Sequence, residues 1–240
     1  MIAAVSMVKD EAPMIGATVR HMLSQGIEHV WIVDWFSTDG TRELLSEFDE
    51  VTLLDADESV YYGSHQPRHI NRAADLAGAS GAEWIVPFDA DEWWTGTHDR
   101  TIAEALSMVT ADRVQATILQ YVDFDHRELR QYPWQKVAYR YAPGRRVVAG
   151  NHYIEGGEGP ADEDALLVHE MKFRSFEHFV QKCTRKIPWN EARDENQFGL
   201  AIGGDHCVYA SYSIEQMNLE WQWLHEEIED CSIPSEFRPL

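Results

Sequence analysis

Cysteine is scarce in this sequence, and so are long apolar runs. The three cysteines, at positions 183, 207 and 231, stand far apart and lack the C-x-x-C spacing of a zinc site. Their number and spacing argue against a disulfide framework and indicate a reducing compartment. No stretch approaches the roughly 20 consecutive apolar residues of a membrane span, and the N-terminal MIAAVSMVKDE lacks the basic segment of a signal peptide. We therefore expect a cytoplasmic protein with no integral membrane segment.

Basic residues are also scarce. Lysine and arginine number 20 against 41 aspartates and glutamates, which gives a formal net charge of −21. A chain of this charge repels nucleic acid, which argues against a nucleic-acid partner. An anionic substrate would need a metal ion or a local group of basic side chains to bind.

Two phosphate-binding motifs are missing. The sequence has no G-x-x-x-x-G-K-[ST] loop of a P-loop NTPase. The glycines at 156, 157 and 159 do not stand between an expected strand and an expected helix, so they form no dinucleotide fingerprint. These absences exclude two common ways of holding a nucleotide.

Strands and helices are expected to alternate through the first 90 residues. Short runs rich in β-branched and aromatic residues predict strands at 2–8, 30–33, 51–54 and 84–88. Apolar residues at helical spacing predict helices between them, the last over 67–79. This alternation indicates a parallel sheet with helices on both faces.

The pattern changes after residue 94. A predicted helix over 101–109 is followed by longer strands at 114–121 and 136–141, which we expect to add to the sheet in antiparallel fashion. The remaining predicted elements are a short strand at 166–169, a helix over 175–187 and an amphipathic helix from Ile214 to Ile228. No linker separates a second independent domain.

Residues 83–94, EWIVPFDADEWW, combine a buried strand with a cluster of acids. The strand runs into Asp89, Asp91 and Glu92, and carboxylates removed from water repel one another. Mg²⁺ or Mn²⁺, held by one or two carboxylates together with water and phosphate oxygens, would relieve that repulsion. The alternative is an acidic turn that faces solvent.

Polar residues follow two other expected strands as well. Residues 9–11 come after the first strand, and Asp34 ends the second. Ligands of parallel sheets bind beyond the carboxyl ends of the strands. We therefore expect residues 9–11, Asp34 and residues 89–92 to gather at one binding edge.

Five segments in one order resemble those of a known family. They are MVKDE, VDWFSTDGT, WIVPFDADEWW, GNH at 150–152 and VHEMKFRSFEHFVQK at 168–182. Over residues 2–187 the chain is similar to family 2 glycosyltransferases of a short bacterial-type branch. The sequence departs from the family pattern at Trp35 and Phe36, where small or polar residues are usual, and at Glu170, where an aromatic is expected.

The resemblance implies an α/β fold of GT-A type. It implies a single domain over 1–240 with a mostly parallel central sheet flanked by helices, antiparallel additions and C-terminal helices. Within it, 1–95 would bind the nucleotide, 96–190 would complete the acceptor and metal sites, and 191–240 would form a helical extension.

The resemblance also implies a metal-dependent transferase. Such an enzyme moves a sugar from a UDP-, GDP- or dTDP-sugar to an acceptor hydroxyl, with inversion. Asp34 would contact the base or ribose, with Lys9 and Glu11 beside it. Asp89 and Asp91 would hold Mn²⁺ or Mg²⁺, and His169 is a candidate third ligand. The remaining substrate-binding candidates are Arg68, Arg174 and Lys182 for the diphosphate and His152 for donor or acceptor.

The general base and the reaction class stay open at the level of sequence. An inverting transferase needs a carboxylate that takes the proton of the acceptor hydroxyl. The candidates are Glu92, Asp123, Asp125, Glu155 and the acids at 162–164. The other readings of the chain are a nucleotidyltransferase or phosphohydrolase on a related sheet, and a non-catalytic sugar- or nucleotide-binding module of the same fold.

Overall fold

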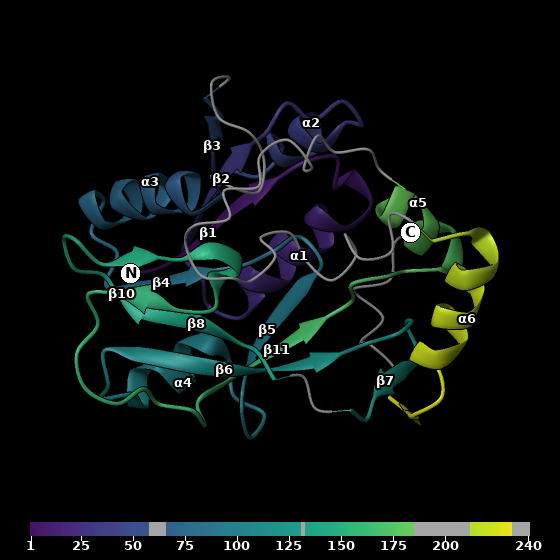
Figure 1. Ribbon diagram of the computed structural model, residues 1–240. Helices are drawn as coiled ribbons and strands as arrows, with labels where there is room; N and C mark the ends of the chain where they lie inside the picture. Colours follow the sequence, from purple (N-terminus) through teal and green to yellow (C-terminus); the bar gives the residue numbers. More distant parts are fainter. Residues whose placement is uncertain (58–65, 131–132, 185–211, 232–240) are drawn as a thin grey trace.

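A computed structural model describes residues 1–57, 66–130, 133–184 and 212–231 (Figure 1). Its centre is one eight-stranded sheet in the order β3-β2-β1-β4-β8-β6-β11-β5. The strands are β1 (Ile2–Val8), β2 (His29–Asp34), β3 (Val51–Asp55), β4 (Trp84–Pro87), β5 (Glu92–Gly96), β6 (Arg113–Gln120), β8 (Gln135–Arg140) and β11 (Leu166–Glu170). The predicted α/β class with a mostly parallel sheet is confirmed.

The directions of the strands determine which strand ends lie at the same edge of the sheet. β1 is parallel to β2 and β4, β2 to β3, and β6 to β11. β8 is antiparallel to both β4 and β6, and β5 is antiparallel to β11. The antiparallel additions are therefore confirmed. The carboxyl ends of β1, β2, β4, β6 and β11 share one edge with the amino ends of β5 and β8.

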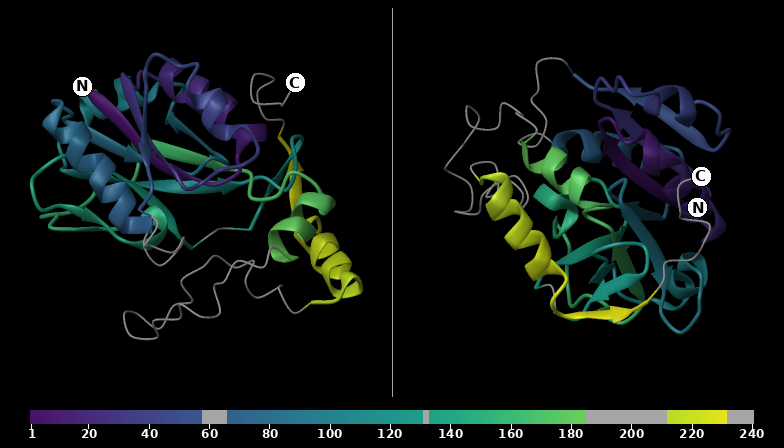
Figure 2. Two further views of the ribbon diagram at one scale, coloured as in Figure 1. Left: turned by 90° about the horizontal axis from the view of Figure 1, so that it is seen from above. Right: turned by 90° about the vertical axis from the view of Figure 1, so that its right-hand side faces the viewer.

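Helices cover both faces of the sheet, as the sequence predicts (Figure 2). One core joins alternate residues of β1, such as Ala4 and Val8, to α1 (Ala12–Ser24) and α4 (Ile102–Met108). A second core joins Ala3 and Val5 to α3 (Gln66–Ala79). Because successive residues of a strand point to opposite faces, a strand buried on both faces reads as a continuous apolar run. A five-residue helix, α2 (Thr41–Leu45), follows β2.

A C-terminal region packs beside the sheet (Figure 1). α5 (Phe176–Thr184) and α6 (Ile214–Leu224) meet through Phe179 and Met217. The short elements are β7 (His126–Glu128), β9 (Arg146–Val147), the 3-10 turn η1 (Ala149–Asn151), β10 (Ile154–Glu155) and β12 (Ile228–Asp230).

The expected last helix is too long. It ends at Leu224, and Ile228 lies in β12, where it pairs with Glu128 of β7. The apolar Ile228 fits a helical period, but its backbone is taken up by pairing with a distant strand. Residues 185–187 of the expected α5 lie outside the described residues.

Two further findings concern the whole chain. Within the described residues, no helix is both long enough and apolar enough to cross a membrane. Cys231 forms no disulfide bond with any described residue. The side chains of Cys183 and Cys207 lie outside the described part of the structure.

Candidate active site

Residues 89–92, which we call the acid turn, connect β4 to β5 at the carboxyl edge of the sheet. The turn is tight, since the Glu92 N–H donates to the carbonyl of Asp89 at 3.1 Å. The carbonyl of Ala90 accepts from the Thr18 hydroxyl at 2.7 Å, and that of Asp91 accepts from the Met171 N–H at 2.9 Å. The backbone of the turn is therefore fixed from α1 and from the segment after β11.

Asp89 is held by its side chain as well. Its Oδ2 lies 2.6 Å from Nζ of Lys136, and its Oδ1 accepts from Gln66 and Asn151 at 3.3 Å each. Burial would lower the pKa of Lys136, but Asp89 and Glu92 raise it well above the usual value. Lys136 therefore carries its charge in the buried site.

Asp91 pairs with a different lysine. Nζ of Lys182, on α5, lies 2.8 Å from Oδ2 of Asp91 and also donates to the carbonyl of Lys172 at 3.0 Å. Burial opposes ionisation of Asp91, yet the ammonium groups of Lys182 and Lys136 bring the pKa of Asp91 below its usual value. Asp91 is thus ionised beside the half-buried Lys182, while Asp89 pairs with the buried Lys136.

Glu92, one of the candidate bases, is sealed inside the protein. It is 0% exposed. Its Oε2 accepts from the Asp89 N–H at 3.1 Å and from the Trp94 indole at 3.2 Å, and its Oε1 lies 2.7 Å from Lys136. A carboxylate with no access to solvent cannot take a proton from an acceptor that arrives from outside. The position in the sequence, next to the D-x-D, gave no sign of this burial.

Glu170 and His169 show how strand parity divides the site. Neighbouring residues of a strand point to opposite faces. Glu170 accepts from Gln120 at 2.7 Å, and burial together with Asp91 raises its pKa. Glu170 therefore belongs to the acid-turn side.

His169 faces the other way. Its Nε2 lies 3.2 Å from the Thr95 hydroxyl and its Nδ1 lies 3.1 Å from the Tyr121 hydroxyl. Burial, with small contributions from His21 and Arg127, lowers the pKa of His169 to about 4. The structure does not bring His169 to Asp89 and Asp91, so its expected place as a third metal ligand has no geometric support.

Asp34 lies at the same edge, as predicted, but it is only 5% exposed. Its Oδ1 accepts from the Ser37 N–H at 3.2 Å, and its Oδ2 lies 3.3 Å from Arg42. Lys9 donates to the carbonyl of Phe36, with its ammonium 5.5 Å from the centre of the Trp35 ring. With strands spaced about 4.8 Å apart, Asp34 on β2 and the acid turn after β4 stand about 10 Å apart across β1.

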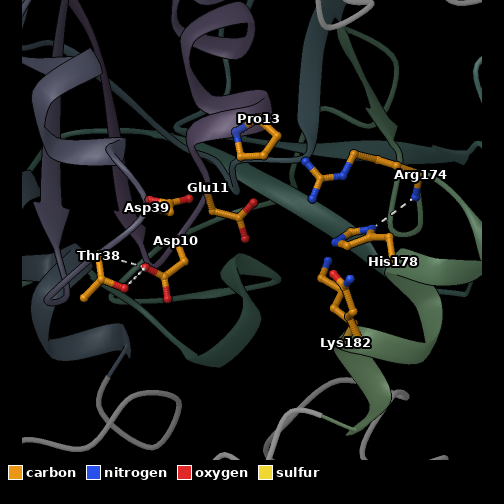
Figure 3. Close-up of a pocket in the computed structure, with 9 residues that line it drawn as sticks. Asp10, Glu11, Pro13, Thr38, Asp39, Arg174, His178 and Lys182 are labelled. Atoms are coloured by element: carbon orange, nitrogen blue, oxygen red, sulfur yellow. Dashed lines mark hydrogen bonds between the residues drawn. The ribbon is translucent and has the colours of Figure 1, made fainter.

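A cavity of about 330 Å³ lies between the loop after β1 and α5 (Figure 3). Asp10, Glu11 and Asp39 form its acidic wall, and Arg174, His178 and Lys182 form its basic wall. Nη1 of Arg174 is buried and has no hydrogen-bond partner among the described residues. A buried cationic donor without a partner is costly, and the arginine to which it belongs lines the cavity.

The remaining basic candidates are placed less centrally. Arg68, whose side chain is 62% exposed, pairs with Asp57 at 3.2 Å. Nδ1 of His152 donates to the carbonyl of Gln135 at 2.7 Å. In the G-N-H segment it is the first two residues that reach the acid turn. The carbonyl of Gly150 accepts from Lys136 at 3.0 Å, and Asn151 binds Asp89.

The other base candidates separate clearly. Asp123 follows β6 at the carboxyl edge, is 32% exposed, and binds His126 at 2.8 Å. Glu155 is exposed and lies opposite Arg146 in the antiparallel pair of β10 and β9. The Arg146 side chain binds Asp75 of α3 at 3.0 Å. Gln66 begins α3 at the acid turn, and nine residues of helix place Asp75 about 14 Å farther along. The structure therefore does not bring Glu155 to the site. Residues 162–164 lie beside the start of β6, at the opposite edge.

The donor set fits a divalent cation that arrives with phosphate. Within the described residues no three His, Cys, Asp or Glu side chains are grouped so that they alone could hold a metal ion. Mg²⁺ needs only one or two carboxylates when substrate phosphates and water complete its shell. Asp89 and Asp91 pair with the ammonium groups of Lys136 and Lys182, while burial raises the pKa values of Glu92 and Glu170. The two aspartates are therefore the carboxylates that suit an added cation.

Comparison with known proteins identifies the family. The family model for glycosyl transferase family 2 matches residues 4–166. The chain belongs to this family. The resemblance to this family found in the sequence is thereby confirmed. No curated protein matches the chain.

Several solved structures are similar to this glycosyltransferase at low identity. S. aureus TarS 1-349 in complex with UDP-GlcNAc is 12% identical, with a TM-score of 0.48 over 93% of this chain and 72% of that one. A second structure of S. aureus TarS 1-349 is 14% identical, with a TM-score of 0.42, over 58% of this chain and 46% of that one. HddC from Yersinia pseudotuberculosis is 11% identical, with a TM-score of 0.35, over 71% and 77% of the two chains. These low similarities transfer no substrate to this chain.

Proposed function

We propose that this family 2 glycosyltransferase moves a sugar from a nucleotide-diphospho-sugar to an acceptor hydroxyl, with a bound Mg²⁺ or Mn²⁺ ion and with inversion. The observation that carries the proposal is the cavity beside the acid turn. There Arg174 and Lys182 line one wall, and the ammonium of Lys182 lies 2.8 Å from ionised Asp91. Basic donors and carboxylates in one site suit a diphosphate that binds with a cation.

In this proposal the donor lies along the carboxyl edge. Its base or ribose lies beside Asp34 and the loop of Lys9 and Glu11. A carboxylate offers about four lone-pair positions, and the Ser37 N–H and Arg42 occupy two of those on Asp34. The span of about 10 Å to the acid turn leaves room for the diphosphate over Arg174 and Lys182.

Asp89 and Asp91 would hold the cation, which when bound acts as a Lewis acid on the leaving diphosphate. Lys182 would turn from Asp91 toward the phosphate oxygens as the donor enters. Arg68 and His152 would contact the outer parts of donor or acceptor. Asp123, at the same edge and open to solvent, would take the proton of the acceptor hydroxyl.

The test is calorimetric titration of the protein with UDP, GDP and dTDP, each with and without Mn²⁺. We expect one nucleotide to bind, and Mn²⁺ to tighten it. Asp91→Asn should weaken the Mn²⁺-dependent binding at least tenfold. Asp49→Asn, the same chemical change at an exposed position, should have no effect.

Transfer is then followed as release of the nucleoside diphosphate from matching sugar donors, and NMR of the product gives the anomeric configuration. A protein that binds none of the nucleotides with or without Mn²⁺ would overturn the proposed donor. A product with retained configuration would refute inversion alone.

A further inference from the structure

Lys136 is one of the few charged side chains buried in the core of this protein. It lies on β8 and is 4% exposed. Its ammonium has three close oxygen neighbours, which are Oδ2 of Asp89 at 2.6 Å, Oε1 of Glu92 at 2.7 Å and the carbonyl of Gly150 at 3.0 Å. An ammonium has three N–H donors. Two of them bind Asp89 and Gly150, and the ion pair with Glu92 holds the ammonium from a third side.

The neighbours of Lys136 hold the same turn from other sides. The Glu92 carboxylate accepts a hydrogen bond from the backbone N–H of Asp89. Gln66 of α3 and Asn151 of η1 donate hydrogen bonds to the Asp89 carboxylate. Gly150 can present its carbonyl to Lys136 because its backbone is left-handed, with φ of 75°. Among the residues that the structure describes, Lys136 is the one group that contacts the Asp89 side chain, the Glu92 side chain and η1 together.

We propose that Lys136 is a positioning residue for the transfer reaction, which fixes Asp89 and with it the acid turn in the geometry that receives the donor. The proposal rests on the proposed function, since it concerns the same site. It assigns Glu92 to the same task from the backbone side. Neither residue touches the donor or the acceptor.

The competing explanation is that Lys136 only neutralises buried acid. Lys136→Met alone does not separate the two, because it leaves Asp89 and the buried Glu92 without their counter-charge and so destabilises the fold by itself. The double variant Lys136→Met/Glu92→Met removes the ammonium and the neighbouring acid together. Methionine has no oxygen to accept the Asp89 N–H, so Asp89 loses both anchors.

A matched control disturbs the cluster without touching the anchors. Trp94→Phe removes the indole N–H that binds Glu92 but leaves Lys136 against Asp89. This control shows how far a local loss of stability alone changes hydrogen exchange and nucleotide affinity.

The first measurement needs no ligand. Hydrogen exchange of the peptide over 88–94 is compared with that of β3, which β2 and β1 separate from β4. We expect exchange over 88–94 to be at least tenfold faster in the double variant and unchanged in β3, with melting temperatures close to that of the unaltered protein. A turn that stays as protected as before would overturn the proposal, whatever the protein binds.

The second measurement is nucleotide affinity with and without Mn²⁺. We expect the double variant to lose at least tenfold in the presence of Mn²⁺ and less than twofold in its absence, because only the cation depends on Asp89 and Asp91. Trp94→Phe should keep both affinities. Equal Mn²⁺-dependent affinity in the double variant and the unaltered protein would refute the positioning role, whereas failure of the unaltered protein to bind any nucleotide would refute the proposed function.

Discussion

Replacing His169 with glutamine tests the geometry of β11 through the pH dependence of stability. The imidazole is buried between Thr95 and Tyr121, and its pKa is lowered from 6.5 to about 4. In the unfolded chain it titrates near 6.5, so between pH 6.5 and 4 the unfolded state binds more protons than the folded state. The stability that neutral His169 contributes is therefore complete above pH 6.5 and is lost as the pH falls.

The size of the effect follows from the shift. A difference of about 2.5 pKa units corresponds to about 3 kcal/mol, of which about 2 kcal/mol is lost by pH 5. Glutamine does not titrate and can still bind Tyr121. The difference in unfolding free energy between the unaltered protein and His169→Gln should thus shrink by about 2 kcal/mol from pH 7.5 to pH 5.

Urea unfolding at four pH values between 7.5 and 5 measures this difference. The control is His126→Gln, because the hydrogen bond to Asp123 raises the pKa of His126. The stability that protonated His126 contributes is present below pH 6.5 and is lost as the pH rises. The loss of unfolding free energy caused by each substitution should therefore change with pH in opposite directions for the two variants. A difference for His169→Gln that stays flat with pH would refute the buried, neutral imidazole.

The same variant decides whether His169 binds the metal. Both ring nitrogens have partners on the side of β11 away from Glu170, so we expect Mn²⁺-dependent nucleotide affinity to stay within twofold. A loss of tenfold or more would show that His169 is a ligand and that this part of the strand rearranges when the donor binds.

Two further predictions concern the base and the packing of α3. Asp123→Asn should lower kcat by about 10² or more, the usual scale for a lost general base, while Glu155→Gln should leave kcat within twofold. A large loss of kcat in Glu155→Gln and a small one in Asp123→Asn would make Glu155 the base instead. Gly78→Ala places a Cβ 2.2 Å from Cε1 of Tyr141 and should destabilise by about 1–3 kcal/mol in urea unfolding. Gly16→Ala meets only the end of the Leu44 side chain, at 3.0 Å, and gains helix propensity, so it should be neutral or stabilising; equal losses in the two variants would contradict the close approach at Gly78.

Much of this fold can be predicted from the sequence, because the order of strands and helices allows few arrangements. Apolar runs that alternate with helical spacing require a parallel sheet, and parallel strands require their carboxyl ends to meet. Residues 9–11, Asp34 and residues 89–92 were therefore predictable as neighbours from local patterns. The five ordered segments that point to the family are also local, which is why the sequence alone revealed them.

The sequence could not show which acids of the site are free to react. Lys136 stands in an ordinary strand pattern, 47 residues from Asp89, and only the insertion of β8 between β4 and β6 places it beneath the acid turn. Asp123 and Glu155 are equally plausible bases in the sequence. In the structure, Asp123 follows β6 at the binding edge, whereas Glu155 lies on the β9–β10 hairpin against the far part of α3.

His169 and Glu170 show the limit most directly. Adjacent strand residues must point to opposite faces, so the sequence determined that only one of them could face the acid turn. Which one it was depended on the register of β11 against β5 and β6, where Glu170 lies opposite Glu92 and Gln120. That register is a contact between segments far apart in the chain, and a shift of one residue would exchange the two side chains. The sequence by itself determined the family and the binding edge, and the tertiary structure decided which side chains enter the site.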